Sequence, residues 1–220
     1  MMHESVQKLI YIQNEVKSIL INKDSSNLPK IIAVSKTFEL DKILPLINHG
    51  HLDFGENKVQ EAIKKWTDIK NKKPEIQLHM IGKLQSNKVK FAVKLFDFIH
   101  SVDNEKLAKK IAEEQLKLKK KIKIFIQVNV GNESQKSGIN SNNISNFLNY
   151  CENLDLEVVG LMCIPPESSD PKVFFEQMNE LAKKYNLKEL SMGMSSDYLK
   201  AAQLNSTYLR IGSSIFGQRL

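Results

Sequence analysis

The architecture of the whole chain is indicated by the run IIAVSK at residues 31–36. A helical pattern follows it around 39–49. The apolar residues of this run continue without the strict polar alternation of a half-exposed strand, which is typical of a parallel strand buried on both faces. A buried strand followed by an amphipathic helix is a βα unit, and repeated units of this kind predict a parallel sheet covered by helices.

The same unit recurs along the chain. Seven more strand-like runs follow: LDFGEN (52–57), IQLHMIG (76–82), DFIHS (97–101), IKIFIQVNV (122–130), LEVVGLMC (156–163), ELSMGM (189–194) and TYLRIG (207–212). Helical patterns separate them at about 57–69, 86–95, 104–119, 141–152, 171–185 and 196–204. Eight such strands predict one α/β domain over 1–220, a closed (β/α)8 barrel of the TIM type. An open doubly wound sheet is the alternative, although no glycine-rich dinucleotide fingerprint follows the first strand.

One further amphipathic helix precedes the first strand, at about 4–22, and we expect it to cover the barrel from outside. The chain has 220 residues, 41% of them apolar and 26% charged, which fits one globular domain with a sizeable core. No apolar stretch is long enough to cross a membrane, and the start of the chain does not resemble a secretion signal. Only two cysteines are present, Cys151 and Cys163, so we expect a reducing, cytoplasmic location and no metal site.

The net charge of +7 comes from a strong bias towards lysine, since only Arg210 and Arg219 among the 32 basic residues are arginines. Nucleic-acid readers usually rely on arginine, and the lysines here fall mostly on the polar sides of predicted helices. We therefore expect lysines such as Lys64 and Lys65 to be solvated, and no nucleic acid as a partner.

Functional residues of such barrels lie at the carboxyl ends of the strands. Lys36 ends the first strand and shares a face with Ile32 and Val34, which predicts a lysine amine at the mouth of the barrel. Partly apolar surroundings lower the pKa of a lysine and leave more of the neutral amine that attacks aldehydes. Taken alone, Lys36 is better interpreted as an exposed or snorkelling lysine.

The two loops after the last strands favour a phosphate site. In SMGMSSD (191–197), Ser195 or Ser196 is expected to cap the next helix, and in RIGSSIFG (210–217) Gly212 allows close backbone approach. Ser213 and Ser214 add hydroxyl donors. A ligand that carries both an aldehyde and a phosphate would use the lysine and these loops, and pyridoxal phosphate is the obvious candidate.

Arg210 shares a strand face with Tyr208 and Gly212, so its guanidinium is expected at the barrel mouth. An arginine beside a pyridine nitrogen keeps its proton, which leaves the ring unprotonated and a poor electron sink. Asn57 and Asn129 also lie near strand ends and either line the mouth or satisfy buried backbone groups. For His79 we expect a hydrogen-bonded position in the core.

Eight segments resemble signature segments of a known family: AVSKT (33–37), FGENKVQE (54–61), HMIGKLQSNK (79–88), SVDN (101–104), QVNVGNESQKSG (127–138), GLMCIP (160–165), LSMGMSSD (190–197) and STYLRIGSSIFG (206–217). In this order and over nearly the whole chain, they are similar to the pyridoxal phosphate homeostasis proteins, the YggS/PROSC family. The resemblance implies a single barrel like the N-terminal domain of alanine racemase.

The resemblance also implies site residues. Pyridoxal phosphate would be held as a Schiff base on Lys36, with Asn57 beside it and Arg210 facing the ring nitrogen. The phosphate contacts would come from Ser195, Gly212 and Ser213, with Ser191 as a further contact. The sequence departs from the family at Lys83, where proline is more common, and at Asn205, where glycine is common. Asparagine tolerates a left-handed backbone, so the turn at Asn205 is expected to survive.

Three functions follow from these observations. The first is a protein of intracellular pyridoxal phosphate homeostasis, a monomer that buffers the cofactor or delivers it to apo forms of cofactor-dependent enzymes. We expect no robust turnover, because a racemase of this barrel type needs an opposing base that related enzymes take from another domain and subunit, and this chain ends soon after its eighth strand. The second is an amino-acid racemase or a Schiff-base aldolase acting on a phosphorylated sugar. The third is a nucleic-acid binder driven by the positive charge.

Overall fold

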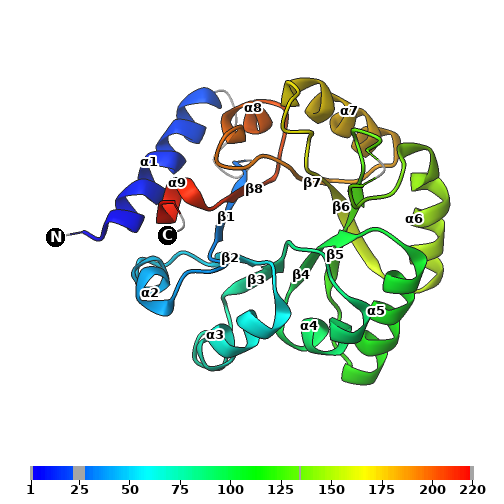
Figure 1. Cartoon of the computed structure of the whole chain (residues 1–220), viewed down its shortest axis with the longest axis horizontal. Coiled ribbons are helices and arrows are strands. Elements are labelled where there is room, and N and C mark those ends of the chain that lie inside the picture. Colours follow the sequence, from blue (N-terminus) through cyan, green and yellow to red (C-terminus); the bar gives the residue numbers. More distant parts are fainter. Residues whose placement is uncertain (1, 22–27, 134, 219–220) are drawn as a thin grey trace.

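The computed structural model describes residues 2–21, 28–133 and 135–218, and in it eight parallel strands close into a barrel in chain order (Figure 1). Strands β1 and β8 pair through Ile31 and Leu209, which closes the sheet and excludes the open alternative. The strands are β1 (Lys30–Val34), β2 (Asp53–Glu56), β3 (Gln77–Met80), β4 (Phe98–Val102), β5 (Lys123–Val128), β6 (Glu157–Cys163), β7 (Glu189–Ser191) and β8 (Tyr208–Ile211).

Helices follow the strands and surround the barrel. They are α2 (Leu40–Asn48), α3 (Val59–Lys72), α4 (Val89–Leu95), α5 (Glu105–Leu118), α6 (Ile144–Asn153), α7 (Pro171–Lys184), α8 (Tyr198–Gln203) and α9 (Ser213–Phe216), with single turns at Ser86–Lys88 and Ser141–Asn143. All the expected helices are present. The short α9 was not expected, because four residues cannot display a helical period.

The N-terminal helix α1 (Glu4–Ile19) packs against α2, α8 and α9, as Figure 1 shows beside β1 and β8. Its buried stripe includes Val6, Leu9 and Val16, so the expected outer cover is confirmed. The helix ends before the expected residue 22, which lies outside the described residues. Helix α1 therefore adds to the helical cover of this part of the barrel, where it packs on the four-residue α9.

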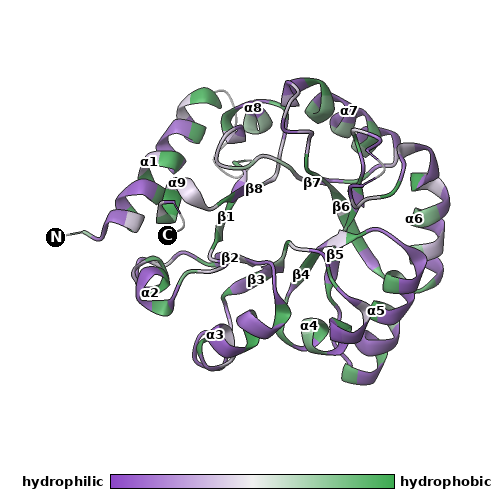
Figure 2. Ribbon diagram, viewed as in Figure 1, coloured by the Kyte–Doolittle hydropathy of each residue, from purple (hydrophilic) through white to green (hydrophobic). Residues whose placement is uncertain are grey.

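Apolar residues form two separate cores. The larger one lies between the barrel and its helices, which carry both hydrophilic and hydrophobic residues (Figure 2). The smaller one fills the inside of the barrel and comprises Ile32, Val34, Phe98, Phe125, Met162 and Tyr208. Leu209 and Ile211 belong to the outer core, so the expected division of β8 between its two faces is confirmed.

Two features bear on other expectations. Asn205 adopts a φ of 62°, the left-handed conformation that its turn was expected to require. Within the described residues, no helix is both long enough and apolar enough to cross a membrane.

The barrel closes tightly at Gly160, where β6 pairs with Glu189 of β7. A Cβ atom at this position would lie 1.9 Å from the Glu189 carbonyl oxygen, so the strands can approach only if residue 160 is glycine. We predict that Gly160→Ala lowers the free energy of unfolding by about 1–3 kcal/mol. Urea denaturation measures this change, and an unaltered midpoint would contradict the close approach.

Candidate functional site

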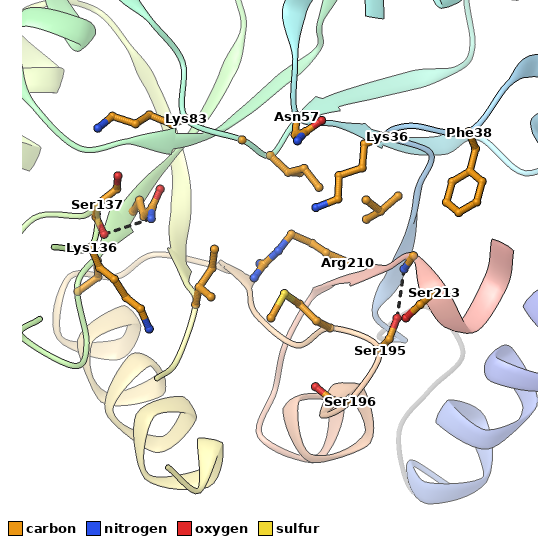
Figure 3. A pocket seen from close by; sticks show the side chains of 18 of the residues that line it. Lys36, Phe38, Asn57, Lys83, Lys136, Ser137, Ser195, Ser196, Arg210 and Ser213 are labelled. Carbon is orange, nitrogen blue, oxygen red and sulfur yellow. Dashed lines mark hydrogen bonds between the residues drawn. The ribbon is translucent and has the colours of Figure 1, made fainter. Parts of the chain in front are cut away.

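A cavity of about 890 Å³ opens at the carboxyl ends of the strands, where the sequence predicted the functional residues (Figure 3). Four basic side chains line it: Lys36, Lys83, Lys136 and Arg210. No aspartate or glutamate does so within the described part of the chain. A wall with this balance of charge favours an anionic ligand.

Lys36 lies two residues beyond the end of β1, half-buried, and its side chain extends into the cavity towards Arg210 (Figure 3). Asn57, just after β2, lines the same part of the wall. Its Oδ1 atom is buried and has no hydrogen-bond partner among the described residues. The wall beside Lys36 therefore offers a buried polar group that a ligand can satisfy.

The loops after β7 and β8 meet on another side of the cavity. The Ser195 hydroxyl accepts hydrogen bonds from the backbone N–H groups of Gly212 and Ser214, each at 3.3 Å. The Ser213 side chain lies close to that of Ser195 (Figure 3). Backbone N–H groups and hydroxyls thus converge here, which is the kind of donor set that phosphate requires.

The expected capping role of Ser195 or Ser196 is wrong. Helix α8 begins after Asp197, whose Oδ1 atom accepts the Met194 N–H at 2.6 Å and closes the preceding turn. The hydroxyl of Ser195 instead reaches across to the loop after β8. It therefore joins the two loops rather than ending a helix.

Arg210 is buried, and its guanidinium is fixed by two hydrogen bonds. It donates from Nη1 to the Ser191 hydroxyl at 2.7 Å and from Nη2 to the Cys163 carbonyl at 2.8 Å. Burial lowers the pKa of Arg210 from its ordinary value, but a guanidinium in a protein keeps its proton. Ser191 is fully buried beneath Arg210 and does not line the cavity, so its position suits support of the arginine rather than contact with a ligand.

A chain of hydrogen bonds continues from Ser191 through the interior of the barrel. His100 Nδ1 lies 2.8 Å from the Ser191 hydroxyl, and His100 Nε2 lies 3.0 Å from Nδ1 of His79. Nε2 of His79 in turn lies 3.0 Å from the Asp53 carboxylate. The His79 ring stacks on Phe98 with the ring centroids 4.4 Å apart, and the His100 ring stacks on Phe125 with the centroids 4.2 Å apart.

The Asp53 carboxylate and the burial of both rings together set the direction of the bonds in this chain. An ionised Asp53 can only accept, so His79 donates to it from Nε2. With both buried histidines neutral, His79 Nδ1 accepts from His100 Nε2 and His100 Nδ1 accepts from the Ser191 hydroxyl. Burial lowers the pKa of His79, although the Asp53 carboxylate opposes it, and burial lowers the pKa of His100 well below the ordinary value. Burial tends to raise the pKa of Asp53, but the hydrogen bond from His79 and the nearby positive charge of Lys30 outweigh it, so that pKa falls.

The expected core position of His79 is confirmed, since its side chain is fully buried and hydrogen-bonded. His100, in the predicted strand DFIHS, was missed as a member of the site. Alternation with Phe98 would have placed it on the inner face, but no sequence signal pairs it with Ser191, 91 residues away.

Two other residues named from the sequence have different positions. Asn129 lines the cavity, and its side-chain amide also donates to the Glu133 carbonyl, so it both lines the mouth and satisfies a backbone group. Cys163 is fully buried and unpaired, and burial raises its pKa to about 12.

The solvation expected for the helix lysines is wrong at one position. Lys64 is exposed, but the Lys65 side chain is only 7% exposed and forms ion pairs with Glu56 and Glu61. The i,i+4 spacing to Glu61 can be read from the sequence, but the position of Lys65 on α3 does not reveal Glu56 as a partner or the burial of the pair.

Residues 19–220 match the model of the family described as alanine racemase, N-terminal domain. The pyridoxal phosphate homeostasis protein of Pasteurella multocida is 34% identical over 225 residues, which cover 97% of each chain. The human protein of the same name is 36% identical over 213 residues, or 87% of this chain and 77% of that one. This chain belongs to the pyridoxal phosphate homeostasis protein family.

Solved structures agree with this membership of the pyridoxal phosphate homeostasis proteins. PipY of Synechococcus elongatus PCC7942, solved without pyridoxal phosphate, has a TM-score of 0.86 and 31% identity, covering 98% of this chain and all of that one. PipY with pyridoxal phosphate bound has a TM-score of 0.80 and 33% identity. The match covers 93% of this chain and 99% of that one. An alanine racemase of Clostridium difficile 630, at 14% identity and a TM-score of 0.70, shares the fold over 97% of this chain and 57% of its own.

The buried neutral histidines make the stability of this family member dependent on pH. Their pKa values in the folded state lie below the ordinary 6.5, so the unfolded state binds more protons as the pH falls through this value. We predict that the unfolding free energy is fully retained above pH 6.5. Below it, this free energy decreases by up to about 1.4 kcal/mol per pH unit for each histidine.

Urea denaturation between pH 8 and pH 5 tests this slope. His100→Gln removes one titrating group and is expected to flatten it, whereas His49→Gln, at an exposed position, serves as the control. Equal slopes for all three proteins would show that His100 does not remain neutral in the fold.

Proposed function

We propose that this protein binds pyridoxal 5'-phosphate in the cavity at the barrel mouth, with Lys36 as its covalent anchor, and that it acts in pyridoxal phosphate homeostasis. One observation carries the proposal. A lysine amine, a buried arginine and a cluster of backbone N–H groups lie in one cavity, and its described lining residues include no carboxylate. The names of the relatives and the cofactor-bound PipY structure support it.

The residues present fit this cofactor. Ser195, Ser213 and the N–H of Gly212 would hold the phosphate, and Arg210 would donate to the ring nitrogen. Asn57 would lie beside the ring. Ser191 would act through Arg210, whose guanidinium it fixes, rather than on the phosphate. The cofactor supplies an aldehyde that condenses with a lysine amine, forming a C=N bond and releasing one water.

The fixed guanidinium bears on what this chain can catalyse. Arg210 would not protonate the ring nitrogen, which weakens the ring as an electron sink. The described cavity lining contains no histidine, tyrosine, cysteine or carboxylate as an opposing base for a racemase. Both observations support a role in holding and releasing the cofactor without robust turnover.

An open mouth suits exchange with partner proteins. Lys83, Ser196 and Ser213 line the cavity and are exposed to solvent, so a bound cofactor would remain reachable. Apo forms of pyridoxal phosphate-dependent enzymes are the proposed recipients. That the protein is a cytoplasmic monomer without nucleic-acid partners stays a prediction.

An amino-acid racemase is the second candidate function, because alanine racemases share the barrel at low sequence identity. It predicts exchange of the α-hydrogen of an amino acid with solvent deuterium, abolished in Lys36→Ala. A Schiff-base aldolase would instead lack visible absorbance and be trapped by borohydride only in the presence of a phosphorylated sugar.

We predict that the purified protein absorbs visible light after incubation with pyridoxal phosphate and that borohydride bleaches this band. Lys36→Ala is expected to lose the reducible band, because the proposal assigns the covalent bond to the Lys36 amine. Absorbance spectra before and after reduction, with mass spectrometry of the reduced peptide, measure both effects. A colourless wild-type protein that takes up no cofactor would exclude this function.

Ser195→Ala tests the phosphate cradle. Because its hydroxyl contacts the two converging N–H groups, we predict about tenfold weaker binding of pyridoxal phosphate. Ser196→Ala is the matched control, since this neighbouring serine is exposed and is expected to change affinity less than about twofold. Fluorescence or absorbance titration measures both, and equal affinities for the two variants would argue against the cradle.

A further inference from the structure

Lys36 lies in a tight turn whose conformation is unfavourable for its sequence. The Phe38 N–H donates to the Ser35 carbonyl at 3.2 Å, so residues 35–38 form a β-turn with Lys36 and Thr37 at its centre. Thr37 has a φ of 68°, whereas Lys36 is not among the residues with positive φ. This is the pattern of a type II turn, in which the position of Thr37 normally requires glycine or asparagine.

A β-branched residue at positive φ is a strained residue. Such strain persists only where surrounding contacts hold the backbone in place, and it is concentrated at functional sites. The strain here is directly next to the lysine that the proposed function assigns to the cofactor. The contacts that hold Thr37 therefore decide where the Lys36 amine lies.

Three charged residues outside the cavity lining make those contacts. Lys65 on α3 donates from its Nζ atom to the Ser35 carbonyl at 2.9 Å, to Glu56 at 3.0 Å and to Glu61 at 3.2 Å. These three bonds use all three protons of its ammonium group. Glu61 also accepts the Thr37 N–H at 2.6 Å, so one carboxylate holds both the strained residue and the lysine.

Glu56 fixes the start of the turn. Its Oε1 atom accepts the Ser35 hydroxyl at 2.7 Å, the Lys65 ammonium and the Trp66 indole N–H at 2.9 Å. The Glu56 side chain is fully buried, so these bonds are shielded from water. At the other end of the turn, Phe38 stacks on Phe216 of α9 with the ring centroids 5.0 Å apart.

We propose that Glu56, Glu61 and Lys65 form a positioning clamp that holds Ser35 and Thr37 and thereby directs the Lys36 amine into the cavity. None of the three lines the cavity, so they are positioning residues that act through the turn. The proposal deepens the proposed function and rests on it for the identity of the ligand. Buried ion pairs rarely add net stability, which fits a role in fixing one conformation.

Glu61→Ala is the main test, because the Glu61 side chain is 29% exposed and its loss leaves the core intact. It removes the acceptor of the Thr37 N–H, and we expect the concentration of pyridoxal phosphate needed for half-maximal borohydride trapping on Lys36 to rise at least about fivefold. Asp68→Ala, an exposed acidic position on the same helix, is the control and is expected to match the wild type.

Thr37→Gly separates positioning from a general structural effect. Glycine adopts positive φ without strain, so the turn no longer needs Glu61. We expect Thr37→Gly alone to trap the cofactor within about twofold of the wild type. The double variant Thr37→Gly/Glu61→Ala is expected to regain most of the trapping that Glu61→Ala loses. An equal loss from Glu61→Ala in both backgrounds would overturn the proposal.

A measurement without cofactor keeps the proposal separate from the proposed function. Hydrogen exchange of the Thr37 amide is expected to accelerate at least about tenfold in Glu61→Ala, and not in Asp68→Ala. Unchanged exchange would overturn the clamp even if the wild type binds pyridoxal phosphate. Accelerated exchange in a protein that traps no cofactor would instead exclude the proposed function and retain the clamp around Lys36.

Lys65→Met tests the centre of the clamp and is compared with Lys64→Met, its exposed neighbour. Loss of Lys65 leaves Glu56 buried without its cation, so lower thermal stability is expected together with weaker trapping. Folding is checked by circular dichroism. If this variant folds and traps the cofactor as well as Lys64→Met does, Lys65 has no part in the clamp.

Discussion

A guanidinium can only donate hydrogen bonds and a carboxylate can only accept them, and this constraint orders the interior of the barrel. Arg210 at the mouth and Asp53 at the opposite end are joined through Ser191, His100 and His79. The Asp53 carboxylate requires a proton on Nε2 of His79, and because burial keeps both histidines neutral, each remaining bond in the series then has one direction. A barrel interior that is otherwise largely apolar and aromatic therefore holds the buried guanidinium of Arg210 in a single orientation.

Much of this arrangement could be predicted from the sequence. Apolar runs separated by helical patterns predict the barrel, and the two-residue period of strands places Lys36 and Arg210 on its inner face at the mouth. For Asn57 the sequence indicates only a position near a strand end. Glycine and serine in the last two loops predict the donors of the phosphate side. These features depend on local pattern and on the barrel topology that eight βα units favour over an open sheet, so one sequence is enough to indicate them.

The remaining features depend on which side chains meet across the barrel or between layers. Lys65 has the pattern of a solvated helix lysine, and only the packing of α3 against β2 and the turn after β1 shows that it is buried between two carboxylates. His100 and Ser191 are far apart in sequence and meet only because the barrel closes. Ser195 was assigned to a helix cap because local sequence cannot show that its hydroxyl reaches a neighbouring loop.

The concentration of basic side chains around the mouth also affects how fast a ligand arrives. Lys36, Lys83, Lys136 and Arg210 line one concave surface, so the electric field of the protein is focused there. A phosphate monoester diffusing nearby is drawn towards the opening before it makes any contact, and dissolved salt weakens this attraction. Lys83 adds to this field, so association kinetics in this chain depend on ionic strength as well as on the contacts inside the cavity.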